Sequence, residues 1–219
     1  MGWRETVREV AHERATAESL ELWGQPRGEQ PRFNYRWEHL RAVERLSSWL
    51  GRELGADDEV LTAAVWLHDL VKSHEPGMPE VSDSETAAAE ARVVLESTDF
   101  PPSKIDRVCE AIRTHEGLTL DRPLEALESA ILWDADKLSK LGAIHLVHNL
   151  CVRTVFDPIF QGRPTDTDLV ISGEEAWLAI SAGIVASMNT EPARLEAARR
   201  LDFLKTFMQE LKGEWETIR

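Results

Sequence analysis

Apolar residues recur along most of the chain at the three- and four-residue spacing of amphipathic helices, and no segment shows the alternation of a half-buried strand. The pattern predicts six helices, over about 3–22, 35–54, 57–70, 84–96, 103–115 and 123–150, and two more that begin near Ser172 and Pro192. We therefore expect an all-α fold, with a single domain that spans residues 1–219.

Local signals refine the ends of these helices. Ser103 and Asp106 have the spacing of a capping box, with Asp in place of the usual Glu, and Ser172 and Glu175 form a better one. Gly142 is expected to bend or interrupt the sixth helix, because glycine lowers helix stability.

Two segments are expected to be irregular. The stretches 73–83 and 157–168 contain proline and glycine, and loops of this kind often carry function. We expect them to supply contacts that select a substrate. The helices over about 170–215 show no cluster of metal-ligand residue types, so we expect them to pack on the core or to form an interface, as in a homodimer.

Composition and charge narrow the classes of function. The 219 residues are 42% hydrophobic and 29% charged, which is ordinary for one globular domain. There is no run of 18 apolar residues and no signal-peptide pattern, so we expect a cytoplasmic protein with no membrane contact. The net charge of −14 argues against binding to a nucleic-acid polymer, which needs a basic surface. The two cysteines are too few for a disulfide framework.

Strong metal-ligand residues occur on apolar helix faces. His39 is followed on its face by apolar residues four, seven and eleven positions later, and His68 is preceded by apolar residues three, four and seven positions earlier. Asp69 adjoins His68, and neighbours on a helix point about 100° apart, so both can reach one ion only where the helix ends. Asp134 and Asp136 lie in a later apolar helix.

The combination favours a metal site over separate structural roles. A single histidine on an apolar face is more often a hydrogen-bonded core residue than a ligand. Here two imidazoles and carboxylates from separate helices occur together. Such a mixed set of nitrogen and oxygen ligands suits one divalent ion among Mn, Fe, Co, Zn, Ni and Mg, and does not select among them.

The order of these residues resembles the HD-domain metal-dependent phosphohydrolase superfamily. The resemblance covers about residues 35–150 and rests on 36-RWEH-39, 68-HDLVK-72 and 134-DADKL-138. It implies a helical bundle of the HD-domain/phosphodiesterase type, with a metal ion held by four residues: His39, His68, Asp69 and Asp136. Periodicity favours Asp134 as the ligand, but the family motif favours Asp136, and Asp134 is then a supporting or structural carboxylate.

The resemblance also implies roles for further residues. Asp69 would orient the attacking water or take its proton, and His115 in 113-RTHEG-117 would protonate the leaving group or help to hold a second ion. Lys72 is a further catalytic candidate, together with Asp69 and His115. The candidates for binding the phosphate of the substrate are Arg36, Lys72, His74 and Lys137.

The expected activity is metal-dependent hydrolysis of a phosphate ester or anhydride in a small metabolite, with a nucleotide as the favoured substrate and metal-bound water as the nucleophile. One alternative is a dinuclear-iron oxygenase of the same fold, which would need both His74 and His115 for the second ion. The other alternative is a non-catalytic module that binds a nucleotide.

Overall fold

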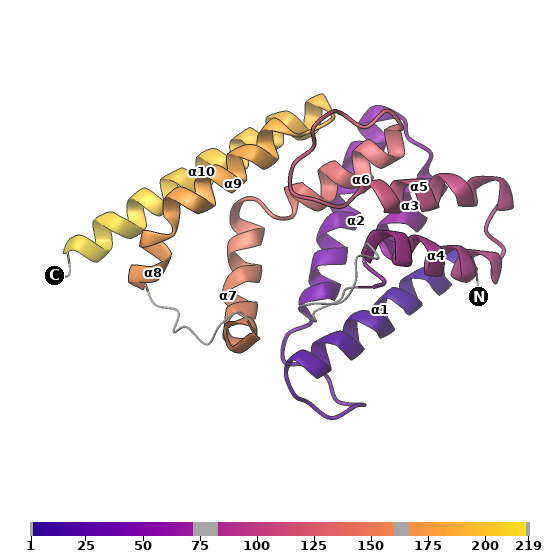
Figure 1. Ribbon diagram of the computed structural model, residues 1–219, viewed down its shortest axis with the longest axis horizontal. Coiled ribbons are helices and arrows are strands. Elements are labelled where there is room, and N and C mark those ends of the chain that lie inside the picture. Colours follow the sequence, from indigo (N-terminus) through magenta and orange to yellow (C-terminus); the bar gives the residue numbers. More distant parts are fainter. Residues whose placement is uncertain (1, 72–82, 160–166, 218–219) are drawn as a thin grey trace.

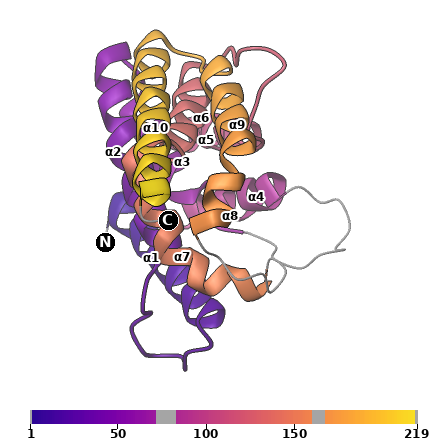
Figure 2. The same cartoon turned by 90° about the vertical axis from the view of Figure 1, so that its left-hand side faces the viewer.

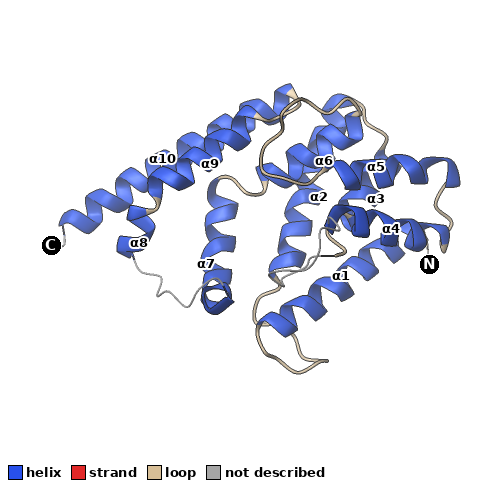
Figure 3. Cartoon of the chain, viewed as in Figure 1, coloured by secondary structure: helices blue, strands red, loops and turns tan. Residues whose placement is uncertain are grey.

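The computed structural model describes residues 2–71, 83–159 and 167–217, except for the side chains of 152–159 and 169. It contains no strand in these ranges, so the predicted all-α class is confirmed (Figure 3). The helices are α1 (Trp3–Leu22), α2 (Tyr35–Leu54), α3 (Asp58–Leu67), α4 (Asp83–Glu96), α5 (Ile105–Thr114), α6 (Leu127–Leu138), α7 (Gly142–Ile159), α8 (Thr167–Ser172), α9 (Glu174–Ala186) and α10 (Glu191–Thr217), with a 3-10 turn η1 (Pro102–Lys104) before α5.

Four helices, α2, α3, α5 and α6, pack against one another at the centre of the fold, with α1 and α4 around them (Figure 1). α3 is almost entirely apolar and almost entirely buried, as expected of a helix that is enclosed on all sides. In α6 every residue from Glu128 to Leu138 is buried, including two aspartates and a lysine. Burying a charge is costly unless the charge is paired or binds a ligand. The buried charged residues of α6 therefore indicate that this helix contributes to a functional site.

The last two helices form a hairpin beside this centre. α9 and α10 run side by side, and α10 also packs on α6 and α7 (Figures 1 and 2). The first half of α10 is fixed by buried apolar residues such as Ala193, Ala197 and Leu201. Its C-terminal half extends to one end of the molecule together with α8 (Figure 1). The first half of α10 therefore packs on the core, through α6 and α7.

Both predicted capping boxes are wrong. Ser103 lies within η1, and α5 follows that turn without a side-chain cap, while Asp106 instead pairs with Arg92 of α4. Ser172 is the last residue of α8, and Gly173 occupies the N-cap position of α9. A motif defined by only two residues, three positions apart, often occurs by chance. Here Asp106 pairs with Arg92 of α4, and the short helix α8 extends through Ser172.

The predicted interruption at Gly142 is correct. Gly142 has φ of 75°, in the left-handed region that favours glycine, and it separates α6 from α7. A Cβ at this position would lie 3.0 Å from Cγ of Arg200 on α10, so the close approach of α10 also favours glycine. The sixth helix starts at Leu127, later than predicted.

Two further boundaries differ from the predictions. The third helix ends at Leu67 and is followed by a turn, so it is shorter than predicted. The irregular stretch predicted over 157–168 is wrong at both ends, because α7 continues to Ile159 and α8 begins at Thr167. Most of the predicted loop 73–83 lies outside the described residues.

Candidate metal centre

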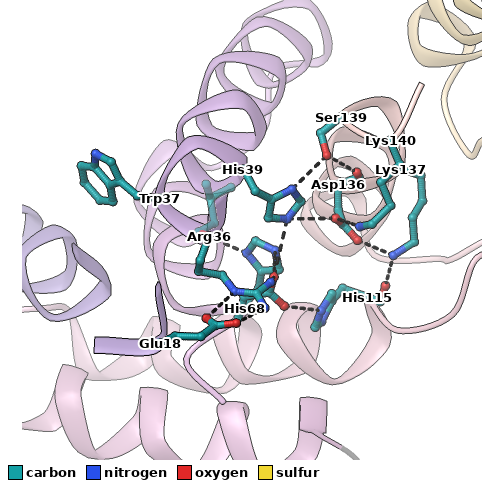
Figure 4. Close-up of polar contacts among 12 residues, drawn as sticks. Glu18, Arg36, Trp37, His39, His68, His115, Asp136, Lys137, Ser139 and Lys140 are labelled. Carbon is teal, nitrogen blue, oxygen red and sulfur yellow. Dashed lines mark hydrogen bonds and ion pairs between the residues drawn. The ribbon is translucent and has the colours of Figure 1, made fainter. Parts of the chain in front are cut away.

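Five buried residues meet where the central helices converge. His39 lies near the start of α2, His68 and Asp69 directly follow α3, His115 directly follows α5, and Asp136 lies in the last turn of α6. Figure 4 shows His39, His68, His115 and Asp136 close together. Their potential ligand atoms form two groups, His39–His68–Asp136 and His68–Asp69–His115, and within each group the atoms lie within 4.8 Å of one another. The structure therefore brings together all four predicted metal ligands and also His115.

The backbone orients two of the three imidazoles. Nδ1 of His68 lies 2.8 Å from the carbonyl oxygen of Val65, and Nδ1 of His115 lies 2.5 Å from the carbonyl oxygen of Ile112. A carbonyl only accepts, so each Nδ1 carries the proton and donates it. In both rings the lone pair of Nε2 is left to face the centre of the cluster.

A hydroxyl orients the third imidazole. Oγ of Ser139 donates to the carbonyl oxygen of Asp136 at 2.6 Å and lies 3.1 Å from Nδ1 of His39. Because the proton of this hydroxyl is already used, Oγ accepts from Nδ1–H of His39. Nε2 of His39 therefore also presents a lone pair to the cluster, and Ser139 acts as the hydrogen-bond partner that metal-binding histidines usually have.

The two carboxylates face these lone pairs. Asp69 is central, because its Oδ2 lies 3.5 Å from Nε2 of His39 and 3.6 Å from Nε2 of His68, and its Oδ1 lies 3.6 Å from Nε2 of His115. Oδ1 of Asp136 lies 3.2 Å from Nε2 of His39. Three imidazole nitrogens and two carboxylates thus converge on one small volume.

His68 supplies the test of whether these residues fit a metal ion. Its Nε2 is buried and has no hydrogen-bond partner among the described residues. Burial lowers the pKa of His68 to about 3, so the ring is neutral at pH 7, as a ligand must be. A buried polar atom without a partner costs about 1–3 kcal/mol, and a bound cation removes that cost. The donor set therefore fits a divalent transition metal.

Two lysines flank the cluster. Lys137 and Lys140 both form ion pairs with Asp136, and Nζ of Lys137 also donates to the carbonyl oxygen of His115 at 2.9 Å (Figure 4). Burial opposes ionisation of Asp136, but the two ammonium charges outweigh it and hold its pKa well below the usual range. Burial lowers the pKa of Lys140 to about 8 despite its carboxylate partner.

Arg36 holds Asp69 in place. Its guanidinium donates to both carboxylate oxygens of Glu18 at 3.0 and 2.9 Å, and to Oδ2 of Asp69 at 2.5 Å (Figure 4). Burial alone would lower the pKa of Arg36, but the charge of Asp69 and the bond to Glu18 raise it overall. Arg36 was predicted to bind phosphate, yet these donors point to carboxylates of the protein, which favours a positioning role.

Asp134 lies apart from the cluster and joins α6 to the start of α10. It is fully buried and accepts four hydrogen bonds, from the backbone N–H and side-chain amide of Asn189 and from the backbone N–H and hydroxyl of Thr190. The structure therefore gives Asp134 a structural role and places Asp136 in the metal cluster.

Three residues at the site were not predicted from the sequence, and two predicted residues lie outside the described part of the chain. Sequence analysis missed Glu18, Ser139 and Lys140. Lys140 follows Asp136 by one helical turn, which is the signal that could have identified it, whereas Glu18 acts across 18 positions of sequence and gives no local signal. The predicted residues Lys72 and His74 lie outside the described residues.

The fold and the cluster together define a class: an all-helical protein with a buried His/Asp cluster, built from four helices, that could hold a metal ion. The family comparison agrees with this class. Residues 36–141 match the model of the HD domain, the family that the motifs of this chain predict. This family match supports a metal-dependent hydrolase.

Solved structures show that the fold extends beyond the matched domain. Bacillus subtilis YpgQ, crystallised in complex with ADP, has 21% sequence identity and a TM-score of 0.60, with 93% of this chain and 97% of that chain covered. A predicted HD superfamily hydrolase from an uncultured Thermotogales bacterium has 24% identity and a TM-score of 0.58, with 95% and 92% covered. An HD-superfamily hydrolase from Bacillus thuringiensis has 19% identity and a TM-score of 0.60, with 96% and 99% covered.

No curated protein matches the chain in sequence. Within the described residues, no helix combines the length and the apolar character that crossing a membrane would require.

Proposed function

We propose that this protein is a metal-dependent phosphohydrolase that cleaves a phosphate ester or anhydride of a small phosphorylated metabolite, with a nucleotide as the favoured substrate. The observation that carries the proposal is the buried cluster of three Nε2 lone pairs and two carboxylates, in which Nε2 of His68 lacks any other partner among the described residues. The complex of the structurally similar YpgQ with ADP supports a nucleotide as the substrate.

In this proposal four residues hold the ion: His39, His68, Asp69 and Asp136. The ion, when bound, supplies positive charge to the phosphoryl oxygens and lowers the pKa of the attacking water. Asp69 accepts a hydrogen bond from that water or takes its proton. Arg36 keeps Asp69 ionised and in position for this role.

His115, Lys137 and Lys140 complete the proposed machinery. Nε2 of His115 faces Oδ1 of Asp69 at 3.6 Å, so its lone pair can take up the proton released by the attacking water and pass it to the leaving oxygen of the substrate. Lys137 and Lys140 place two positive charges beside the cluster, where they stabilise an anionic phosphoryl group. Lys72 and His74 remain candidates for contacts with the substrate.

One observation favours a second ion and therefore keeps the oxygenase alternative open. His68, Asp69 and His115 form a group of their own beside His39, His68 and Asp136. A dinuclear-iron oxygenase would use such a second group together with His74. The binding-module alternative predicts an incomplete ligand set, whereas all four predicted ligands are present in this chain.

Release of phosphate or pyrophosphate tests the proposal. A panel of nucleotides and small phosphomonoesters is assayed with Mn²⁺, Co²⁺, Mg²⁺, Ni²⁺, Zn²⁺ or Fe²⁺. We expect turnover that depends on the metal and falls by about 100-fold or more in Asp69→Asn, because the variant loses the carboxylate next to the water. Asp106→Asn is the matched control, since Asp106 pairs with Arg92 on the surface.

The possible outcomes separate the three functions. Turnover that Asp69→Asn leaves unchanged, or no turnover with any metal, contradicts the proposal. In the latter case, oxygen consumption by the iron-loaded protein would support the oxygenase, and nucleotide binding without reaction would support the binding module.

A further inference from the structure

A cavity lies between α7, α8, α9 and α10, and Lys140, which pairs with Asp136 of the metal cluster, is part of its lining. Its volume is about 640 Å³, within the range of about 300–1,000 Å³ that is typical of small-molecule sites. Its wall is mainly apolar and includes Leu146, Leu150, Trp177, Ile180, Phe207 and Leu211. An apolar recess of this size beside a charged centre is suited to the non-phosphate part of a ligand.

Lys140 connects the cavity to the metal cluster. It lines the cavity, and its ammonium group pairs with the carboxylate of Asp136 (Figure 4). Among the described residues that line the cavity, Lys140 has the only formal charge. On a chain of net charge −14, a recess with a cation and without carboxylates in its described lining favours a ligand that is anionic at the end near Lys140.

A polar pair interrupts the apolar wall. Nδ2 of Asn149 lies 2.8 Å from Nε2 of His145, and both side chains line the cavity. Because the amide donates to Nε2, His145 carries its proton on Nδ1, and Oδ1 of Asn149 offers an acceptor. The ring of Trp177 lies 6.1 Å from that of His145, so donors, acceptors and an aromatic ring stand close together.

We propose that this cavity holds the organic group of the substrate, and that this group is a flat heteroaromatic ring of nucleobase size. The apolar wall and Trp177 would contact the faces of the ring, and His145 and Asn149 would bind its polar edge. Lys140 would neutralise the charge of the phosphate that is attached to this ring through the rest of the ligand. That phosphate would then lie beside Asp136, at the metal cluster. The proposal rests on the proposed function, because it takes the phosphate end of the ligand to lie at the metal centre.

Binding of nucleosides, which lack phosphate, tests the cavity without requiring hydrolysis. Adenosine, guanosine, cytidine and thymidine are titrated into the metal-free protein and followed by saturation-transfer NMR. Ile180→Glu is the test variant, because Ile180 lines the cavity and is 51% exposed, so a charge there is tolerated by the fold. Val93→Glu is the control, since Val93 is 68% exposed on α4 and does not line the cavity.

We expect at least one nucleoside to bind, with affinity about 10-fold or more lower in Ile180→Glu and unchanged in Val93→Glu, because the added carboxylate must be desolvated against the ring. With the metal present, KM for the corresponding nucleotide should rise by a similar factor in Ile180→Glu, while kcat changes little. Asp69→Asn should lose hydrolysis and keep nucleoside binding, which separates the cavity from the chemistry.

Three results would overturn the inference: no nucleoside binds, Ile180→Glu binds as well as the unmodified protein, or Ile180→Glu converts a dimer to a monomer in sedimentation without changing KM. The last result would assign the cavity to an interface between two copies of the chain. If nucleosides bind as expected and no nucleotide is hydrolysed, the proposed function fails and the assignment of the cavity stands.

Discussion

At the scale of single residues, His68 combines burial, neutrality and an unused lone pair. Its Nδ1 donates to the carbonyl oxygen of Val65, and its Nε2 has no partner among the described residues. Folding a polar atom into this environment is unfavourable unless something binds it. A divalent ion is the partner that also explains the neighbouring carboxylates of Asp69 and Asp136.

Replacement of His68 by alanine should abolish tight metal binding while the chain stays folded. We expect the affinity for Mn²⁺ or Co²⁺ to fall by about 100-fold or more, since a ligand is lost together with its orientation. Equilibrium dialysis followed by metal analysis measures this, and far-ultraviolet circular dichroism checks the fold. His12→Ala is the control because His12 is exposed on α1. Equal metal content in the two variants would remove His68 from the site.

At the scale of helices, Asp134 ties the hairpin of α9 and α10 to the metal-bearing helix α6. The carboxylate replaces missing hydrogen bonds at the start of α10, where backbone N–H groups have no partner within the helix. Burial raises the pKa of Asp134, although the donors from Asn189 and Thr190 act to lower it.

Asp134→Ala should therefore destabilise the whole domain. Truncation leaves four buried or partly buried donors of Asn189 and Thr190 without their acceptor, and we expect the free energy of unfolding to fall by about 3 kcal/mol. Urea denaturation measures the change. Asp202→Ala is a control because Asp202 is exposed on the same helix and pairs with Lys205. A loss no larger than in that control would contradict the structural role of Asp134.

A second contact between α6 and α10 should stabilise the fold by an amount that depends on pH. Glu196 pairs with Arg199 and Arg200 of α10, and Arg200 also donates to the carbonyl oxygen of Leu138 in α6 at 2.7 Å. The bond from Arg199, together with Arg200, lowers the pKa of Glu196 to about 2. A carboxylate with a lowered pKa stabilises the fold above its ordinary pKa, and that contribution is lost as the pH falls towards about 2.

Glu196→Gln should thus lower the free energy of unfolding at pH 7 by about 1 kcal/mol, a small value because Arg199 is largely exposed and solvent screens the pair. At pH values near 2 the difference between the variant and the unmodified protein should vanish. Urea denaturation at several pH values between 7 and 2 measures it. A difference that stays constant over this range would show that the charge of Glu196 does not contribute.

At the scale of the whole molecule, the metal centre joins helices that are far apart in the sequence. α2, α3, α5 and α6 each contribute to it, directly or through the residue that follows the helix. An ion bound there connects all four, so binding and folding are linked. The same centre places two lysines, Lys137 and Lys140, beside Asp136 within a chain of net charge −14, so positive charge is concentrated locally at the candidate site.

Metal should therefore raise the thermal stability of the protein. At a free ion concentration of about 100 times Kd, binding adds about 2.7 kcal/mol, which corresponds to a rise in Tm of about 5–10 °C for a domain of this size. Differential scanning fluorimetry with Mn²⁺, and then with excess chelator, measures the rise and its reversal. His68→Ala should show neither, and an equal rise in that variant would indicate binding elsewhere.

Helical periodicity was enough to predict the all-α class, the positions of most helices and the candidate ligands His39 and His68. This is possible because one period of 3.6 residues governs both which face of a helix is buried and which residues point inward with it. The break at Gly142 was predictable for a similar local reason, since glycine favours the backbone conformation found there.

Periodicity alone did not select Asp136 over Asp134, and the tertiary structure gives the physical reason for the choice that the family motif favours. Both residues lie in the same apolar helix, but Asn189 and Thr190, just before α10, supply donors to Asp134, whereas Asp136 faces Nε2 of His39. The roles of Glu18 and Ser139 depend on contacts between helices. The cavity between α7, α8, α9 and α10 likewise forms only when these helices pack together. Sequence spacing describes neighbours along one helix, whereas these features arise from the packing of separate helices, and that packing is determined by the chain as a whole.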